Sequence, residues 1–149
     1  MSPYTYSPAY PTREHERAAE RIARFFSRHE RVEAVLLTCS CARGKASPDS
    51  CLDIAVLVPP DLPEAARTRM EVAWEVEQSS QPVYAELKGV GKYSQVDLDF
   101  TDGQFKPGMH GWTSGPDEFE LSIGNLLAYS VPLWERGDAY RQLKRTWLP

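Results

Sequence analysis

Residues 38–58 follow a short apolar run over 32–37, contain Ser40 and the basic residues Arg43 and Lys45, and end in a second apolar run over 52–58 that carries Asp53. Ser40 follows the first run, where a strand-to-helix turn leaves backbone N–H groups free to hold a phosphate. Asp53 lies near the start of the second run. An acid at the mouth of a buried strand is costly unless it is paired or binds a cation. The segment therefore predicts a phosphate and metal site built between two strands.

Two more acids, Asp97 and Asp99, alternate with apolar residues in the segment 96–100. Side chains alternate across a strand, so both acids share one face, and Cys51 and Asp53 share a face for the same reason. Two acids in step beside a third on another strand suit a hard cation with oxygen ligands. The competing interpretation is the solvated face of a sheet that is buried on one side only.

The order of these residues resembles the signature of the DNA polymerase β-like nucleotidyltransferase superfamily. That signature runs Gly-Ser, then a short basic helical step ending near Ala-Arg-Gly, then Ser-Asp-x-Asp opening a strand. Without gaps, the matching residues are Cys39-Ser40, Ala42-Arg43-Gly44, Ser50 and Asp53. The chain looks most like small bacterial nucleotidyltransferase-domain proteins, over about residues 14–148. The resemblance implies an α/β (α+β) nucleotidyltransferase fold, with helices packed around a small mixed β-sheet.

The resemblance also implies a reaction, the transfer of a nucleoside monophosphate from an NTP to a hydroxyl acceptor of unknown identity. Carboxylates would hold two Mg²⁺ ions for this chemistry. It implies catalytic roles for Asp53, Asp97 and Asp99, with Asp53 and Asp97 as the metal ligands because Asp97 lies deeper in its strand. Nucleotide binding would fall to four residues of the matched segment: Ser40, Arg43, Gly44 and Ser50.

Two residues depart from the family pattern, and both stand at positions that the resemblance implies for nucleotide or metal binding. Cys39 stands where the family has Gly, and Cys51 stands where the first of its paired acids belongs. A thiol is a poor ligand for Mg²⁺, so the site would hold one or two ions, unless Asp49 replaces the lost acid. The alternative function is therefore a catalytically degenerate module that binds nucleotide or a protein partner, as an antitoxin-like regulator.

A zinc site is a weaker alternative for the cysteines. Cys39, Cys41 and Cys51, completed by His110, lack the Cys-x-x-Cys spacing of zinc knuckles. We expect the cysteines to pack the turn. His110 lies on a Gly-rich segment that could line a substrate pocket, and His15 is expected at the surface.

Length and composition are those of one ordinary globular domain. The chain has 149 residues, of which 42% are hydrophobic and 26% charged. Its net charge of −4 argues against broad nucleic-acid binding. We expect no membrane segment and no signal peptide. Three cysteines, an odd number, indicate a cytoplasmic protein.

Periodicity predicts the elements that must position these residues. We expect a flexible tail over residues 1–11 and one nucleotidyltransferase-like domain over 12–149, its first helix capped by Thr12. A capping box over 61–64 would open the second helix. The predicted strands span 32–37, 52–58, 83–87 and 95–100, and residues 131–135 form either a last edge strand or a helix. The predicted helices span 12–29, 61–78 and 138–147, with another beginning at 116 after a loop over 101–115.

Overall fold

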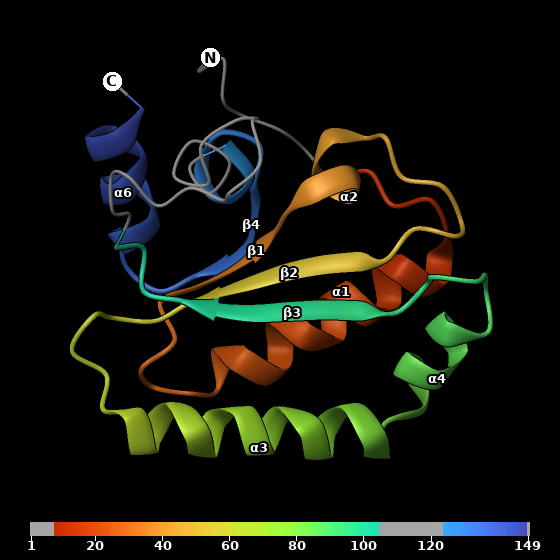
Figure 1. Cartoon of the computed structure of the whole chain (residues 1–149), viewed down its shortest axis with the longest axis horizontal. Helices are drawn as coiled ribbons and strands as arrows, with labels where there is room; N and C mark the ends of the chain where they lie inside the picture. The colour runs from red at the N-terminus through yellow and green to blue at the C-terminus, as the bar shows by residue number, and fades with distance from the viewer. Residues whose placement is uncertain (1–7, 105–123, 149) are drawn as a thin grey trace, which may run out of the picture.

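The chain folds into a four-stranded mixed sheet with helices on both faces (Figure 1). The computed structural model describes residues 8–104 and 124–148. Among the described residues the strand order is β3-β2-β1-β4, with β2 and β3 parallel and the other two pairs antiparallel. The strands are β1 (Ala34–Leu37), β2 (Leu52–Leu57), β3 (Val96–Thr101) and β4 (Val131–Glu135). This confirms the predicted fold class, a small mixed sheet with helices packed around it.

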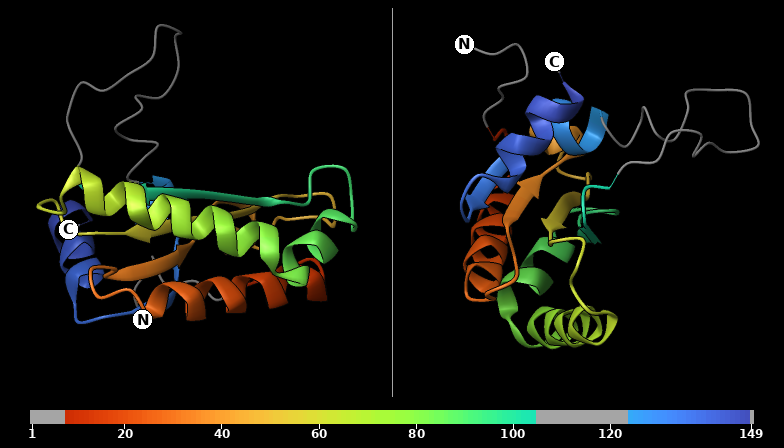
Figure 2. Two further views of the ribbon diagram at one scale, coloured as in Figure 1. Left: turned by 90° about the horizontal axis from the view of Figure 1, so that it is seen from below. Right: turned by 90° about the vertical axis from the view of Figure 1, so that its left-hand side faces the viewer.

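One face of the sheet carries the main hydrophobic core. Three helices pack there: α1 (Arg13–Ser27), α3 (Glu64–Ser80) and α4 (Pro82–Lys88). Figure 2 shows them on the same side of the strands. Thr12 caps α1 as predicted, since its Oγ1 accepts a hydrogen bond from the His15 backbone N–H at 3.2 Å. The fully buried Ile22 and Phe26 of α1 lie in this core beside Trp74.

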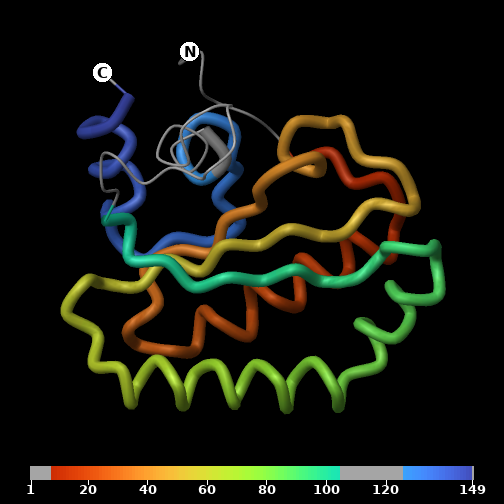
Figure 3. Tube along the Cα trace, in the orientation of Figure 1, coloured from red at the N-terminus to blue at the C-terminus, as the bar shows by residue number. Residues whose placement is uncertain are grey.

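The other face is covered at one end by a smaller core. There Leu36 and Leu57 pack against the π-helical turn η1 (Gly124–Ala128) and α6 (Ala139–Trp147). The short helix α2 (Cys39–Arg43) lies farther along β2, as the trace in Figure 3 shows. The buried residues of α2 belong to the main core, and on the second face Asp53 is half-buried while Asp97 and Asp99 are exposed.

Two predicted elements are wrong. Residues 83–87, expected as a strand, lie in helix α4, where Pro82 takes the first helical position and Tyr84 and Leu87 share one buried face. The capping box at the start of α3 does not form, because α3 begins after Pro63 without a side-chain cap. Asp61 instead accepts a hydrogen bond from Arg31 at 2.7 Å.

The remaining predicted strands and both terminal helices are confirmed to within a few residues. Most of the expected loop over 101–115 and the start of the helix expected from 116 lie outside the described residues. The boundary at residue 12 stays a prediction, although Tyr10 packs against the main core and Ala9 N–H donates to the Cys41 carbonyl at 3.3 Å. No described helix is long and apolar enough to cross a lipid bilayer.

A buried carboxylate joins the three helices of the main core. Glu77 of α3 accepts two hydrogen bonds from Arg21 of α1, at 2.8 and 3.1 Å, and a third from the Tyr84 hydroxyl of α4 at 2.9 Å. Burial alone would raise the pKa of Glu77, but the bonds from Arg21 and Tyr84 outweigh it, and the pKa lies below its usual value. The charged form of Glu77 is thus part of the helical layer.

We predict that Glu77→Gln lowers the free energy of unfolding at pH 7 by about 2 kcal/mol, the scale of hydrogen bonds to a charged group. Because the folded-state pKa is lowered, this contribution exists above the unfolded pKa and is lost as the pH falls through the folded one. Urea unfolding at several pH values measures it. Glu75→Gln, an exposed position on the same helix, is the control, and equal midpoints for the two variants at pH 7 would contradict the prediction.

Candidate functional site

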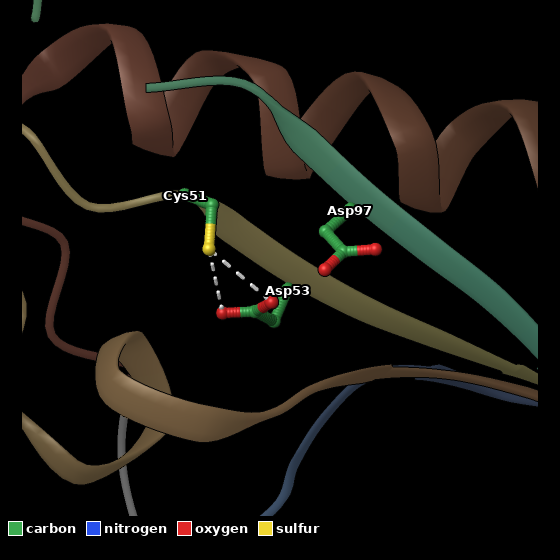
Figure 4. Close-up of side chains that lie close together, drawn as sticks. All are labelled: Cys51, Asp53 and Asp97. Carbon is green, nitrogen blue, oxygen red and sulfur yellow. Dashed lines mark hydrogen bonds between the residues drawn. The ribbon is translucent and has the colours of Figure 1, made fainter. Parts of the chain in front are cut away.

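The parallel pairing of β2 and β3 brings two acids side by side. Asp53 is the register partner of Asp97, and Ala55 is the partner of Asp99. One ligand atom from each of Cys51, Asp53 and Asp97 lies within 4.8 Å of the others. Figure 4 shows the three side chains gathered beside the two strands. The convergence expected from strand parity is therefore present in the structure.

The two later acids differ in their distance from this group. Asp97 and Asp99 are both exposed and both lie on the face of Asp53. Asp97 is directly opposite Asp53, whereas Asp99 is two register pairs farther along and outside the group of three. Geometry thus favours Asp97 as the partner of Asp53, and the catalytic and metal-binding roles of these acids stay predictions.

The group is electrostatically strained. Burial raises the pKa of Asp53, and the negative charges of Asp97 and Asp99 raise it further. A hydrogen bond from the Cys51 thiol, at 3.3 and 3.4 Å to the two carboxylate oxygens, opposes this rise. Burial and the neighbouring Asp53 raise the pKa of the Cys51 thiol to about 11, so the thiol is protonated at neutral pH. A cation at this position would relieve the strain on Asp53.

Helix α2 carries three of the predicted nucleotide-binding residues. Ser40 and Arg43 lie within α2, and Gly44 ends it with a left-handed φ of 71°, while Lys45 N–H donates to the Ser40 carbonyl at 2.9 Å. Cys39, at the other end, has a φ of 58°, and no other non-glycine residue of the described chain has a positive φ. Its position is the one where the family has Gly, so the backbone keeps a conformation that suits glycine.

Arg43 and Ser50 make their remaining contacts outside α2. The exposed Arg43 guanidinium lies 5.4 Å from the ring centre of Tyr129. Ser50 is held in the turn before β2, where its hydroxyl accepts a hydrogen bond from Ser47 N–H at 2.9 Å. Ser50 therefore lies in the turn just before β2 and not in α2. Its hydroxyl already accepts a hydrogen bond within that turn.

His15, expected at the surface, is fully buried and holds this turn from behind. Its Nε2 donates to the Ser50 carbonyl at 2.7 Å, because a carbonyl can only accept, and its Nδ1 bonds to Thr12 Oγ1 at 2.6 Å. The helix cap and the start of β2 are therefore linked through one imidazole. The only sequence signal for this role of His15 is its i,i+3 spacing from Thr12. That spacing does not predict the contact with the distant Ser50.

Asp49 does not replace the acid missing at Cys51. Asp49 is exposed, and its Oδ1 accepts a hydrogen bond from Lys92 N–H at 2.9 Å. A Cβ added at Gly91 would come within 2.2 Å of that oxygen, so Gly91 permits the close approach. The Asp49 carboxylate therefore bonds to the loop before β3 and not to the Cys51–Asp53–Asp97 group.

The zinc site weighed for the cysteines does not assemble from the described residues. Among these residues, the only group of three potential ligands contains Cys51 alone of the cysteines. Cys41 is buried in the main core, and its thiol donates to the Cys51 carbonyl at 3.9 Å, tying α2 to β2. His110 lies outside the described residues.

Comparison with known proteins identifies the domain. A family described as Nucleotidyltransferase domain matches residues 19–98, more than half of the chain. A crystal structure of a toxin–antitoxin with AMP-PNP is 18% identical and covers 91% of this chain and 83% of that one, with a TM-score of 0.48. A crystal structure of a mutant of the toxin–antitoxin MntA-HpeT is also 18% identical, covering 86% and 82%, with a TM-score of 0.49. No curated protein matches the chain.

We predict that Cys39→Gly stabilises the protein by about 1 kcal/mol, because glycine adopts the left-handed backbone without the Cβ clash. Cys39→Ala is the matched control, since it removes the same thiol and keeps the Cβ. Urea unfolding of both variants measures the difference. A Cys39→Gly protein no more stable than Cys39→Ala would show that this backbone is not strained.

We also predict that Asp53→Asn raises the thermal midpoint of the protein in EDTA at neutral pH. Because the folded-state pKa of Asp53 is raised, its ionised form destabilises the fold above that pKa, and the penalty disappears as the pH falls and the carboxyl takes up a proton. The gain should shrink at acid pH and be smaller for the exposed Asp99→Asn. A midpoint that falls at neutral pH would contradict the prediction.

Proposed function

Since the chain belongs to the nucleotidyltransferase domain family, we propose that it transfers a nucleoside monophosphate from an NTP to a hydroxyl acceptor. The observation that carries this proposal is the register pair of Asp53 and Asp97 on adjacent parallel strands, on the open part of the sheet. Two carboxylates that face each other there, one of them with a raised pKa, form a site that a cation would stabilise.

The donor set suits a divalent cation in part. Asp53 and Asp97 offer the oxygen ligands that Mg²⁺ prefers, and the thiol of Cys51 does not. In this proposal Asp53 and Asp97 hold Mg²⁺, one ion or two, and Asp99 contributes negative charge from two register pairs away. When bound, the metal would supply charge neutralisation for the phosphates of the NTP.

The residues of α2 and its flanks bind and orient the nucleotide in this proposal. Ser40 would hold the terminal phosphates through its hydroxyl, and the exposed Arg43 would add positive charge. Gly44 reverses the chain after α2 with a left-handed φ and presents no side chain. Ser50 would act indirectly, since its hydroxyl supports the turn that leads into Cys51 and Asp53.

A second function, a regulatory module that binds nucleotide or a protein partner without turnover, is favoured by one observation. Cys51 stands where the family places an acid, and Asp49 is bonded elsewhere, so one oxygen ligand is missing from the site. Such a module would be antitoxin-like and would keep NTP affinity. With its three cysteines free, either function fits the cytoplasm.

Calorimetry with the four NTPs in Mg²⁺ tests where the nucleotide binds. We expect Asp53→Asn to weaken Mg²⁺-dependent binding by roughly tenfold or more, by analogy with residues that support metal sites. Lys45→Ala, which removes an exposed charge just after α2, should change affinity far less. Equal affinities for wild type and Asp53→Asn would remove Asp53 from the site.

Restoring the family acid tests whether the enzyme or the degenerate module is the better description. Cys51→Asp places a second carboxylate on the strand face of Asp53, which should raise transfer of labelled nucleotide at saturating Mg²⁺ if the natural site lacks only that ligand. It should also lower metal-free stability, because like charges then share a partly buried site. If the wild-type protein transfers nucleotide rapidly and Cys51→Asp is slower, the thiol does not impair the site. If both proteins bind nucleotide but neither transfers it, the regulatory module is favoured.

A further inference from the structure

We propose that Cys51 is itself a metal ligand and that the Cys51–Asp53–Asp97 site selects Zn²⁺ over Mg²⁺. The inference rests on the proposed function, because it concerns the metal of the same site. It replaces the view of Cys51 as a lost ligand with one in which the donor chemistry of the site has changed.

The position of the thiol supports this directly. The Cys51 sulfur lies 3.3 and 3.4 Å from the two oxygens of Asp53, so a cation bound by that carboxylate would have sulfur within reach. A ligand oxygen of Asp97 completes a group whose atoms all lie within 4.8 Å of one another. Figure 4 shows the Cys51 side chain directed toward Asp53 and not away from the site.

The chemistry of the three donors distinguishes the cations. Mg²⁺ requires oxygen ligands, whereas Zn²⁺ accepts both thiolate sulfur and carboxylate oxygen. Three protein ligands are also the number that catalytic zinc sites use, leaving a position for water or substrate. Binding would break the S–H bond of Cys51, form a metal–sulfur bond and release the proton to solvent, with no change of oxidation state.

The hydrogen-bond network around Cys51 holds it in place for this role. His15 fixes the Ser50 carbonyl on one side of Cys51, and the Cys41 thiol contacts the Cys51 carbonyl on the other. Neither contact uses the Cys51 sulfur, which remains directed at Asp53. Cys41 is buried and Cys39 is outside the group of three among the described residues, so a single thiolate is expected at the metal.

Co²⁺, a spectroscopic substitute for Zn²⁺, tests the inference on the full chain without nucleotide. Titration of the reduced wild-type protein should produce a sulfur-to-cobalt charge-transfer absorption in the near ultraviolet. Cys51→Ser, of nearly the same size, should abolish this band, while Cys39→Ala and Cys41→Ala should retain it. Asp53→Asn should weaken Co²⁺ binding, since it removes an oxygen ligand.

Competition between Zn²⁺ and Mg²⁺ gives a second readout. Any such site prefers Zn²⁺ to some degree, so the informative quantity is the change in preference on mutation. We expect the ratio of Zn²⁺ to Mg²⁺ affinity to fall by roughly 10- to 100-fold in Cys51→Asp, the range seen when metal-site residues are altered. Thermal shift with each metal measures the same trend in the folded protein.

The outcomes separate this inference from the proposed function. A bound Co²⁺ without the sulfur band, a band that persists in Cys51→Ser, or an unchanged affinity ratio in Cys51→Asp would overturn the zinc preference alone. The proposed function would still stand if Mg²⁺-dependent NTP binding required Asp53. If no divalent cation bound and NTP binding were absent, both proposals would fail together.

Discussion

The parallel pairing of β2 with β3 is the constraint on which the site depends. It sets Asp53 opposite Asp97 on the face that α1, α3 and α4 do not cover. Burial raises the pKa of Asp53, and the negative charges of Asp97 and Asp99 raise it further. The arrangement is costly in the absence of a cation, which is the condition that an ion-binding site is expected to show.

The rest of the molecule fixes the positions of Asp53 and Asp97. The main core packs the other side of the same strands, and the buried Glu77 with its partners Arg21 and Tyr84 locks the three helices together. His15 reaches from α1 to the carbonyl just before Cys51. The larger core thus lies on one face of the sheet, and the acidic group lies on the other face, beside the smaller core.

The two departures from the family pattern have different physical meanings. Cys39 occupies a left-handed backbone position, so its cost is conformational and its side chain is outside the group of three possible ligands among the described residues. Cys51 lies just before β2, without a positive φ, and changes the donor atoms at the candidate site, so its consequence is chemical. The two substitutions therefore affect separate properties, the backbone conformation at Cys39 and the donor atoms of the candidate site at Cys51.

Local periodicity was enough to predict that Asp97 and Asp99 share a face, that Cys51 and Asp53 share a face, that α1 is amphipathic and that Thr12 caps it, because these features depend only on neighbouring residues. That the two pairs lie on the same face follows from the pairing of β2 with β3. Periodicity could not choose between Asp97 and Asp99 as the acid opposite Asp53, since both have the same parity and only the β2–β3 register separates them. The burial of His15 against Ser50 and the commitment of Asp49 to Lys92 join residues far apart in the chain, 35 and 43 positions respectively. Tertiary packing alone decides such contacts, and it also made residues 83–87 a helix by burying Tyr84 and Leu87 on one side.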